Sequence, residues 1–214
     1  HAIPVRRTVR SAYDPAPVEA MILERIELAA AEHNASLRLV TDPGRRHAIA
    51  GLVAEGDSAQ FADPRFRREL AMWIHSRHGP SHDGISASGF GVPDLLSPVG
   101  ALAVRTFDMG EKAAESDAEI VEGSPAIGVL HTPGDTAGDW IHAGRSLAAL
   151  LLTATASGIR SSYLNQPVEV PELRSRLVDQ VGLRGIPQLV LRFGYGPMVE
   201  PAVRRPAEAV MLPD

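Results

Sequence analysis

The sequence predicts an α+β protein with a central sheet flanked by helices and with a buried core helix. Stretches with helical spacing of apolar residues outnumber the short strand-like runs, and in places helices separate those runs along the chain. The stretch 140–157 is apolar on nearly all sides, which is typical of a helix that protein covers on most of its surface. A length of 214 residues without cysteine favours a single domain over residues 1–214 that needs no disulfide.

Helices are expected where apolar residues recur every three or four positions. Asp63 followed by Pro64 is typical of an N-cap and first helical position. Asp139 is the expected N-cap of the core helix, and Gly158 is expected to end that helix. The expected helices cover residues 18–32, 45–54, 64–75, 110–119, 140–157 and 171–181.

Strands are expected in short apolar or alternating runs bounded by turn residues. These runs cover residues 36–41, 101–104, 125–130 and 187–195. The segment 76–100 fits neither pattern, because it holds five Gly, three Pro and five Ser. A segment of that length and composition is either a functional lid or a surface insertion.

Composition excludes several classes of function. The absence of cysteine excludes thiol catalysis, a zinc–thiolate site and an iron–sulfur cluster. The formal net charge of -5 argues against a general nucleic-acid binder. No apolar run approaches the ~20 residues that a membrane-spanning helix needs. Of the 21 basic residues, 20 are Arg, so an anion site in this chain would be built from guanidinium groups.

Two basic clusters are candidate anion sites. The first is Arg6-Arg7-Thr8-Val9-Arg10, where three guanidinium groups repel one another unless an anion lies among them. The second is Arg204-Arg205-Pro206 at the other end of the chain. Each is either a solvated basic patch or part of a phosphate site, and the two would form one clamp if the ends of the chain met.

Other polar motifs are too loose to define a site. The first of two clusters of possible metal ligands spans the expected end of a helix and a Gly/Pro loop without a rigid i, i+4 pair, and Asp139 of the second is better explained as a helix N-cap. No metal site is therefore predicted. Ser146 lacks the second glycine of a nucleophile elbow. The two clusters are His75, His78, His82 and Asp83, and His131, Asp135, Asp139 and His142.

Four segments, in this order, together resemble the nitroreductase family of flavoproteins. They are the arm 6–10, the Ala-rich helix that ends at 157–159, the strand-like run 185–195 and the basic segment 201–206. The pair Asp139-Trp140 and the run 164–169 are similar to the Acg-like branch of that family, and the chain looks like its C-terminal half.

The resemblance implies a mixed central sheet, with the core helix at a dimer or pseudo-dimer interface, and FMN bound at that interface. It places Arg6, Thr8, Arg204 and Arg205 near the FMN phosphate. It places Arg7 and Arg10 near the phosphate, the ribityl chain or the pyrimidine edge, and Asn165 and Gln166 near the isoalloxazine ring.

The activity that the resemblance implies is cytoplasmic transfer of hydride from NAD(P)H through FMN to a nitro, quinone or similar acceptor. No catalytic side chain is expected, since the cofactor performs the hydride chemistry. Acg-like proteins contain two nitroreductase-like halves, so the expected partner is a second copy of this chain or a missing N-terminal half.

One departure from the family leaves alternatives open. The segment 33–37 lacks the Gln-Pro-Trp that the family places after its first long helix, so only Asn34 could be retained there. The chain could instead bind or sequester FMN with little turnover, with 76–100 closed over the ring. It could also be a structural pseudo-half that binds little itself.

Overall fold

A four-stranded sheet forms the centre of the protein in a computed structural model that describes residues 1–75, 83–86, 97–106, 109–201 and 205–211. Its strands are β1 (Ser36–Val40), β4 (Ala126–Thr132), β6 (Ile186–Gly194) and β5 (Arg160–Tyr163), in the order β1-β4-β6-β5. These strands pair antiparallel, and a parallel bridge from Thr8 to Ser161 adds the N-terminal arm beside β5. The predicted α+β class is therefore confirmed.

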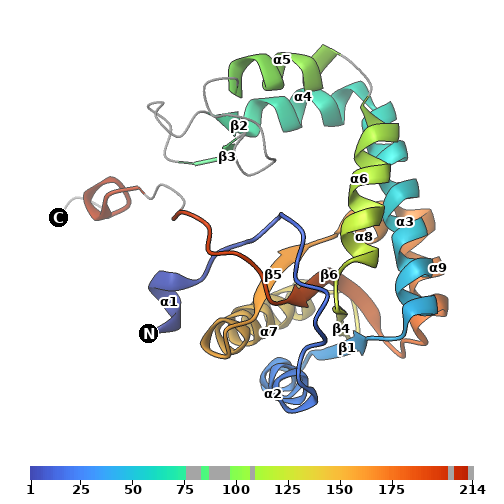
Figure 1. The fold of residues 1–214 in the computed structure, drawn as a ribbon, viewed down its shortest axis with the longest axis vertical. Coiled ribbons are helices and arrows are strands. Elements are labelled where there is room, and N and C mark those ends of the chain that lie inside the picture. The colour runs from blue at the N-terminus through green and yellow to red at the C-terminus, as the bar shows by residue number, and fades with distance from the viewer. Residues whose placement is uncertain (76–82, 87–96, 107–108, 202–204, 212–214) are drawn as a thin grey trace.

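Helices cover both faces of this sheet (Figure 1). One face packs on α2 (Ala20–Ala31) and α7 (Ala137–Ala156), with a core that includes Ile26, Leu150 and Phe193. The other packs on α3 (Pro43–Ala62), α6 (Gly110–Glu122) and α9 (Pro171–Val181) around residues such as Ile49 and Leu177. Successive residues of β4 and β6 alternate between the two cores, as the pleat of a strand requires.

A pair of helices, α4 (Pro64–Trp73) and α5 (Ser97–Thr106), lies beyond the ends of α3 and α6, away from the sheet (Figure 1). Two short strands, β2 (Ile74–His75) and β3 (Ile85–Ser86), adjoin this pair. The predicted strand 101–104 is wrong, because these residues lie inside α5. Of the segment 76–100 proposed as a lid or insertion, residues 76–82 and 87–96 lie outside the described part of the chain.

Side-chain caps define several helix starts. Asp42 accepts a hydrogen bond from the Arg45 amide at the start of α3, and Asp63 caps α4 as predicted. The predicted N-cap of α7 is wrong by one turn. Thr136 is the N-cap, and Asp139 is the third helical residue of a capping box in which each side chain bonds the other's backbone amide.

The core helix α7 buries only one face within this chain. Ala143, Ser146, Leu150, Leu151 and Ala154 are buried, whereas Trp140 and Ile141 are exposed. The remaining elements are the short helices α1 (Ala2–Val5), α8 (Gln166–Glu169) and η3 (Ala207–Ala209). Across the described residues, no helix has the length and apolar character needed to cross a membrane.

Candidate functional site

The N-terminal arm, defined as residues 6–14, lies along β5 at one edge of the sheet. Thr8 bridges to Ser161, and the Val9 amide donates to the Ser161 carbonyl at 3.1 Å. The Val9 side chain is fully buried. Because alternate side chains of an extended segment share a face, Thr8 and Arg10 point away from the face that buries Val9.

Two guanidinium groups of the arm approach Tyr163 at the end of β5. Burial raises the pKa of the Tyr163 hydroxyl, and the positive charges of Arg6 and Arg10 partly oppose that rise. Burial also lowers the pKa of Arg10. Both Arg side chains are half-buried, so an anion beside Tyr163 would meet two partly desolvated cations.

Arg7 is held differently. Its Nη1 donates to the carbonyls of Pro4 and Arg6 at 2.7 and 2.8 Å, so it satisfies backbone groups of α1 and of the turn that follows. Of the predicted arm residues, the structure therefore brings Arg6 and Arg10 together beside Tyr163, with Thr8 between them in sequence.

The end of β6 and the residues directly after it, 194–196, lie beside the same arm. The Asp14 amide donates to the Tyr195 carbonyl at 2.8 Å, and Gly194 packs so closely on Tyr13 that an added Cβ would lie 2.7 Å from its ring. Arg205 pairs instead with Asp83 at 3.1 Å, in an exposed ion pair. Arg204 lies outside the described residues.

The predicted ring contacts Asn165 and Gln166 lie at the N-cap and the first position of α8, with their side chains held by the protein. The side-chain oxygen Oδ1 of Asn165 accepts a hydrogen bond from the Val190 backbone amide at 3.1 Å. The Gln166 amide nitrogen donates to Asp57 at 3.0 Å and to Asp117 at 2.8 Å. Gln166 therefore joins α8 to α3 and α6.

The two carboxyl groups that accept hydrogen bonds from Gln166, the buried Asp57 and the half-buried Asp117, form a pair that the sequence analysis did not identify. Asp57 on α3 is 4% exposed. Burial, followed by the charge of Asp117, raises its pKa to about 7, and burial also raises the pKa of Asp117. The pair therefore holds a proton near neutral pH, since two adjacent buried carboxylates cannot both ionise at little cost. Asp57 and Asp117 are 60 residues apart in sequence, so only the packing of α3 on α6 brings them together.

Arg192 on β6 is a second functional candidate that the sequence analysis did not identify. It is 1% exposed, and its Nη2 donates to the carbonyls of Val9 and Ser11, both at 3.0 Å. Its guanidinium lies 4.0 Å from the centre of the Tyr13 ring. The available signal was an arginine inside an otherwise apolar strand, Leu189-Val190-Leu191-Arg192-Phe193.

Asn34 lies far from the arm in its own chain. It precedes β1, which is the opposite edge of the sheet from β5, and three inter-strand spacings amount to about 14 Å. Asn34 adopts a left-handed conformation with φ 57° and lines a shallow groove beside His131.

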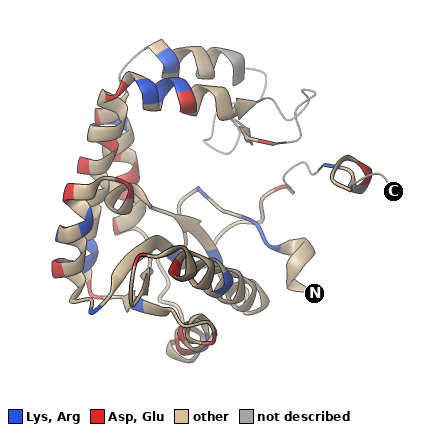
Figure 2. Cartoon of the chain, turned by 180° about the vertical axis from the view of Figure 1, so that it is seen from behind, with Lys and Arg blue, Asp and Glu red and all other residues tan. Residues whose placement is uncertain are grey.

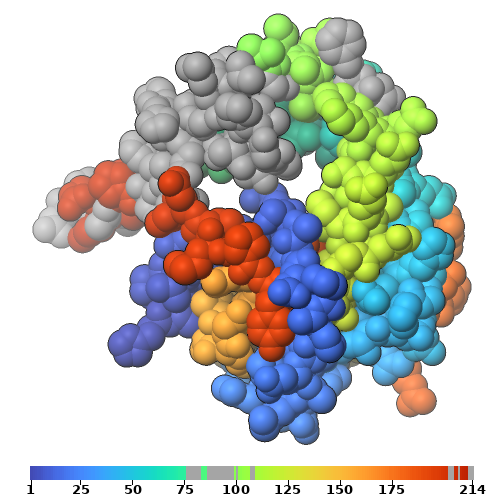
Figure 3. Space-filling model, in the orientation of Figure 1, coloured from blue at the N-terminus to red at the C-terminus, as the bar shows by residue number. Residues whose placement is uncertain are grey.

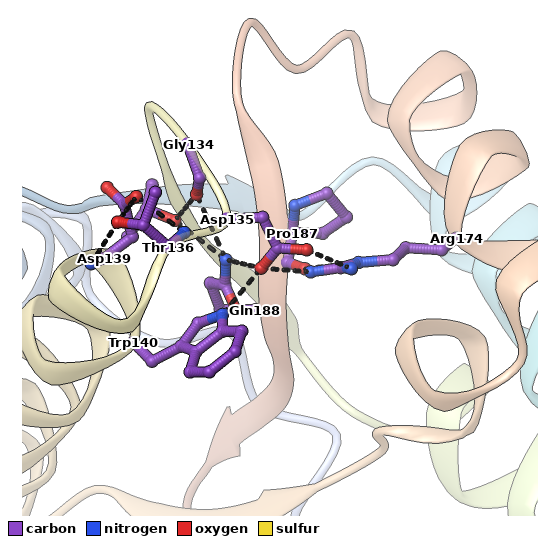
Figure 4. Close-up of polar contacts among 9 residues, drawn as sticks. Gly134, Asp135, Thr136, Asp139, Trp140, Arg174, Pro187 and Gln188 are labelled. Carbon is purple, nitrogen blue, oxygen red and sulfur yellow. Dashed lines mark hydrogen bonds and ion pairs between the residues drawn. The ribbon is translucent and has the colours of Figure 1, made fainter.

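The acidic residues near the start of α7 have structural partners (Figure 4). Asp135 accepts hydrogen bonds from Arg174, Trp140 and Gln188, which hold its pKa well below the usual range. Asp139 belongs to the capping box of α7. In the part of the chain that the structure describes, no group of three or more His, Asp or Glu could hold a metal ion, and His78 and His82 lie outside that part.

The space-filling view shows an opening between the arm and α6 (Figure 3). The charge view shows basic residues along the arm and both signs of charge on the helices of the α3 side (Figure 2). The arm, with its half-buried Arg6 and Arg10, is therefore the candidate site for an anionic ligand in the described structure.

Comparison with solved structures identifies the fold, whereas no family model matches the chain. The FMN-dependent nitroreductase NfnB from Mycobacterium smegmatis, solved in complex with NADPH, aligns with a TM-score of 0.62 at 17% identity, over 100% of this chain and 96% of that one. Iodotyrosine deiodinase, solved with FMN and 3-iodo-L-tyrosine, aligns with a TM-score of 0.63 at 13% identity, over 99% of this chain and 96% of that one. The chain therefore has the nitroreductase fold.

The curated proteins that match this chain in sequence include proteins of Mycobacterium tuberculosis. The chain is 32% identical over 198 residues to "Putative NAD(P)H nitroreductase Rv3131" of Mycobacterium tuberculosis (strain H37Rv), a match that covers 92% of this chain and 55% of the relative. It is 27% identical over 219 residues to the uncharacterized protein Rv3127 of the same strain, covering 98% of this chain and 60% of that protein. The resemblance to nitroreductases is confirmed, and the chain spans little more than half the length of these relatives.

Proposed function

We propose that this chain is the FMN-binding part of an NAD(P)H-dependent oxidoreductase that reduces a nitro, quinone or similar acceptor. The sequence relatives and the fold support this assignment, because relatives carry the name NAD(P)H nitroreductase and structural neighbours contain FMN or NADPH. The observation that carries the proposal is the docked arm, which holds Arg6 and Arg10 half-buried beside Tyr163.

The donor groups of the arm suit the phosphate of FMN. Guanidinium groups form charge-assisted hydrogen bonds with phosphate oxygens, and a threonine hydroxyl adds a neutral donor. Arg6, Thr8 and Arg10 would hold the phosphate, and Arg204 and Arg205 would join them from the segment that follows β6. Arg205 would have to exchange its exposed partner Asp83 for the phosphate, an ion pair that costs little to break.

The cofactor supplies the hydride chemistry, so this chain's task is to bind and orient it. Arg7 would lie toward the ribityl chain or the pyrimidine edge, and Asn165 and Gln166 would form the protein surface facing the ring. The exposed face of α7, with Ile141 65% exposed, would pack against a second half, either another copy of this chain or a missing N-terminal half. We place the protein in the cytoplasm.

The test is spectroscopic. The purified protein, supplemented with FMN, should show bound-flavin absorption, and NADH or NADPH should bleach it in the absence of oxygen. A nitroarene or quinone should then restore the oxidised spectrum. Bound flavin that stays oxidised under excess NADH and NADPH would exclude the oxidoreductase and leave a protein that binds or sequesters FMN.

A second candidate, a structural pseudo-half, is favoured by the position of Gln166. Its amide nitrogen is already committed to Asp57 and Asp117, and the chain lacks Gln-Pro-Trp after its first long helix. In that case the purified chain takes up no FMN by itself but does so when joined to its partner half. Equal FMN uptake by the isolated chain would rule this candidate out.

A further inference from the structure

We propose that Arg192 is a positioning residue that holds the arm, and through it Arg10, in the geometry that binds the phosphate of FMN. This inference rests on the proposed function, and it assigns a role to a residue of the sheet that makes no phosphate contact itself. The starting point is the pair of carbonyls that Arg192 holds. Val9 and Ser11 flank Arg10, so their two hydrogen bonds to Nη2 fix the backbone on both sides of it.

The remaining contacts of Arg192 point to the same role. Its guanidinium stacks on the Tyr13 ring at 4.0 Å, and the Tyr13 hydroxyl donates to the Val9 carbonyl at 3.1 Å. Tyr13 is itself fixed by Gly194 and Gly196, at which an added Cβ would lie 2.7 and 3.0 Å from its ring. Arg192 and Tyr13 thus join the arm to β6 and to the segment that follows it.

The cost of this arrangement indicates that it serves more than packing. Arg192 is buried, and two of its guanidinium nitrogens, Nε and Nη1, have no hydrogen-bond partner among the described residues. The nearby charge of Arg10 repels it, while Asp117 and the Tyr13 ring attract it. An apolar side chain would fill a strand interior without this desolvation. A dianion bound at Arg10 would offset the repulsion between Arg10 and Arg192. Phosphate binding would therefore stabilise the hydrogen bonds from Arg192 to the arm, and those bonds would in turn favour phosphate binding.

The experiment compares FMN with riboflavin, which differ only by the phosphate. In Arg192→Met, FMN affinity should fall by about tenfold or more, the size expected for one misplaced charge-assisted hydrogen bond, and riboflavin affinity should stay within about twofold. Arg174→Met is the matched control, because Arg174 also donates to a backbone carbonyl, that of Pro187, but far from the arm in sequence. It should leave both affinities unchanged. Equal losses of FMN and riboflavin in Arg192→Met would overturn the proposal.

A second measurement does not depend on flavin. Trypsin should cleave after Arg10 faster in Arg192→Met than in the wild type or in Arg174→Met, because the backbone around Arg10 is released. Unchanged cleavage in Arg192→Met would overturn the positioning role. Faster cleavage in Arg192→Met, together with a wild type that binds neither FMN nor riboflavin, would support the hold of Arg192 on the arm and refute the proposed function instead.

Arg192→Lys keeps the test decisive when the Met variant does not fold. Its ammonium retains the charge over Tyr13 but lacks the planar fork of Arg. It should lower FMN affinity several-fold and leave riboflavin affinity unchanged. Unchanged FMN affinity, or equal losses for both ligands, would overturn the proposal.

Discussion

Replacing Asp57 with Asn should stabilise the protein at alkaline pH. Asp57 is buried, accepts a hydrogen bond from Gln166 and lies beside Asp117. An Asn side chain reproduces the shape and hydrogen bonds of the protonated carboxyl, because its oxygen accepts from Gln166 and its amide can donate to Asp117. The substitution therefore removes the cost of ionising Asp57 without opening a cavity.

The size and sign of the effect follow from the raised pKa. Asp57 has a pKa of about 7 in the folded protein, against 3.8 for an ordinary aspartate. At pH values between these two pKa values, Asp57 has lost its proton in the unfolded chain but keeps it in the folded chain. The free energy of unfolding therefore falls as pH rises and levels off above about pH 7. At about 1.4 kcal/mol for each pKa unit, the loss reaches up to about 4 kcal/mol at pH 8.

The assay is denaturant unfolding at several pH values between about 4 and 8. Asp57→Asn should match the wild type near the acidic end and exceed its free energy of unfolding by up to about 4 kcal/mol at the alkaline end. Asp179→Asn, the same change at an exposed position of α9, should show no such pH-dependent gain. A constant difference between Asp57→Asn and wild type across this range would refute the reasoning.

Three further outcomes are expected. Gly56→Ala should lower the free energy of unfolding by about 1–3 kcal/mol in denaturant melts, because its Cβ would lie 2.6 Å from the Gln166 Cβ; an unaffected midpoint would contradict the close packing of α3 on α8. Thr136→Ala should cost about 0.5–2 kcal/mol by removing the cap of α7, and Thr136→Ser should restore most of it. The double change Arg204→Ala and Arg205→Ala should weaken FMN binding by about 2–5 kcal/mol in a titration, and unchanged affinity would contradict the phosphate clamp.

Local sequence signals predicted much of the fold. Asp63-Pro64 predicted the start of α4, and Gly158, with φ 76°, follows the end of α7. The strands β1, β4 and β6 also lie where apolar runs predicted them. Periodicity failed for 101–104, because four consecutive apolar residues fit a helix as well as a strand. The cap of α7 was misassigned because aspartate is favoured in the first turn of a helix as well as at the N-cap, and the apolar run that marks the helix begins only at Trp140.

The candidate site was predictable only where its residues are neighbours in sequence. The basic arm is visible as a cluster, and so the sequence could indicate an anion site there. The role of Arg192 depends on the register of β6 with β5 and on the docking of the arm, which involve residues up to 183 positions apart. The Asp57–Asp117 pair likewise requires α3 to pack on α6, and nothing in either local sequence marks that contact.

The contacts of Val9 have a consequence for synthesis on the ribosome. The partners that fix this residue, the Ser161 carbonyl and the Arg192 guanidinium, belong to the last third of the chain. Since translation delivers the N-terminus first, the arm emerges long before it has anything to dock on. The arm is therefore synthesised before the strands on which it docks, and the proposed anion site can assemble only after β6 has left the exit tunnel.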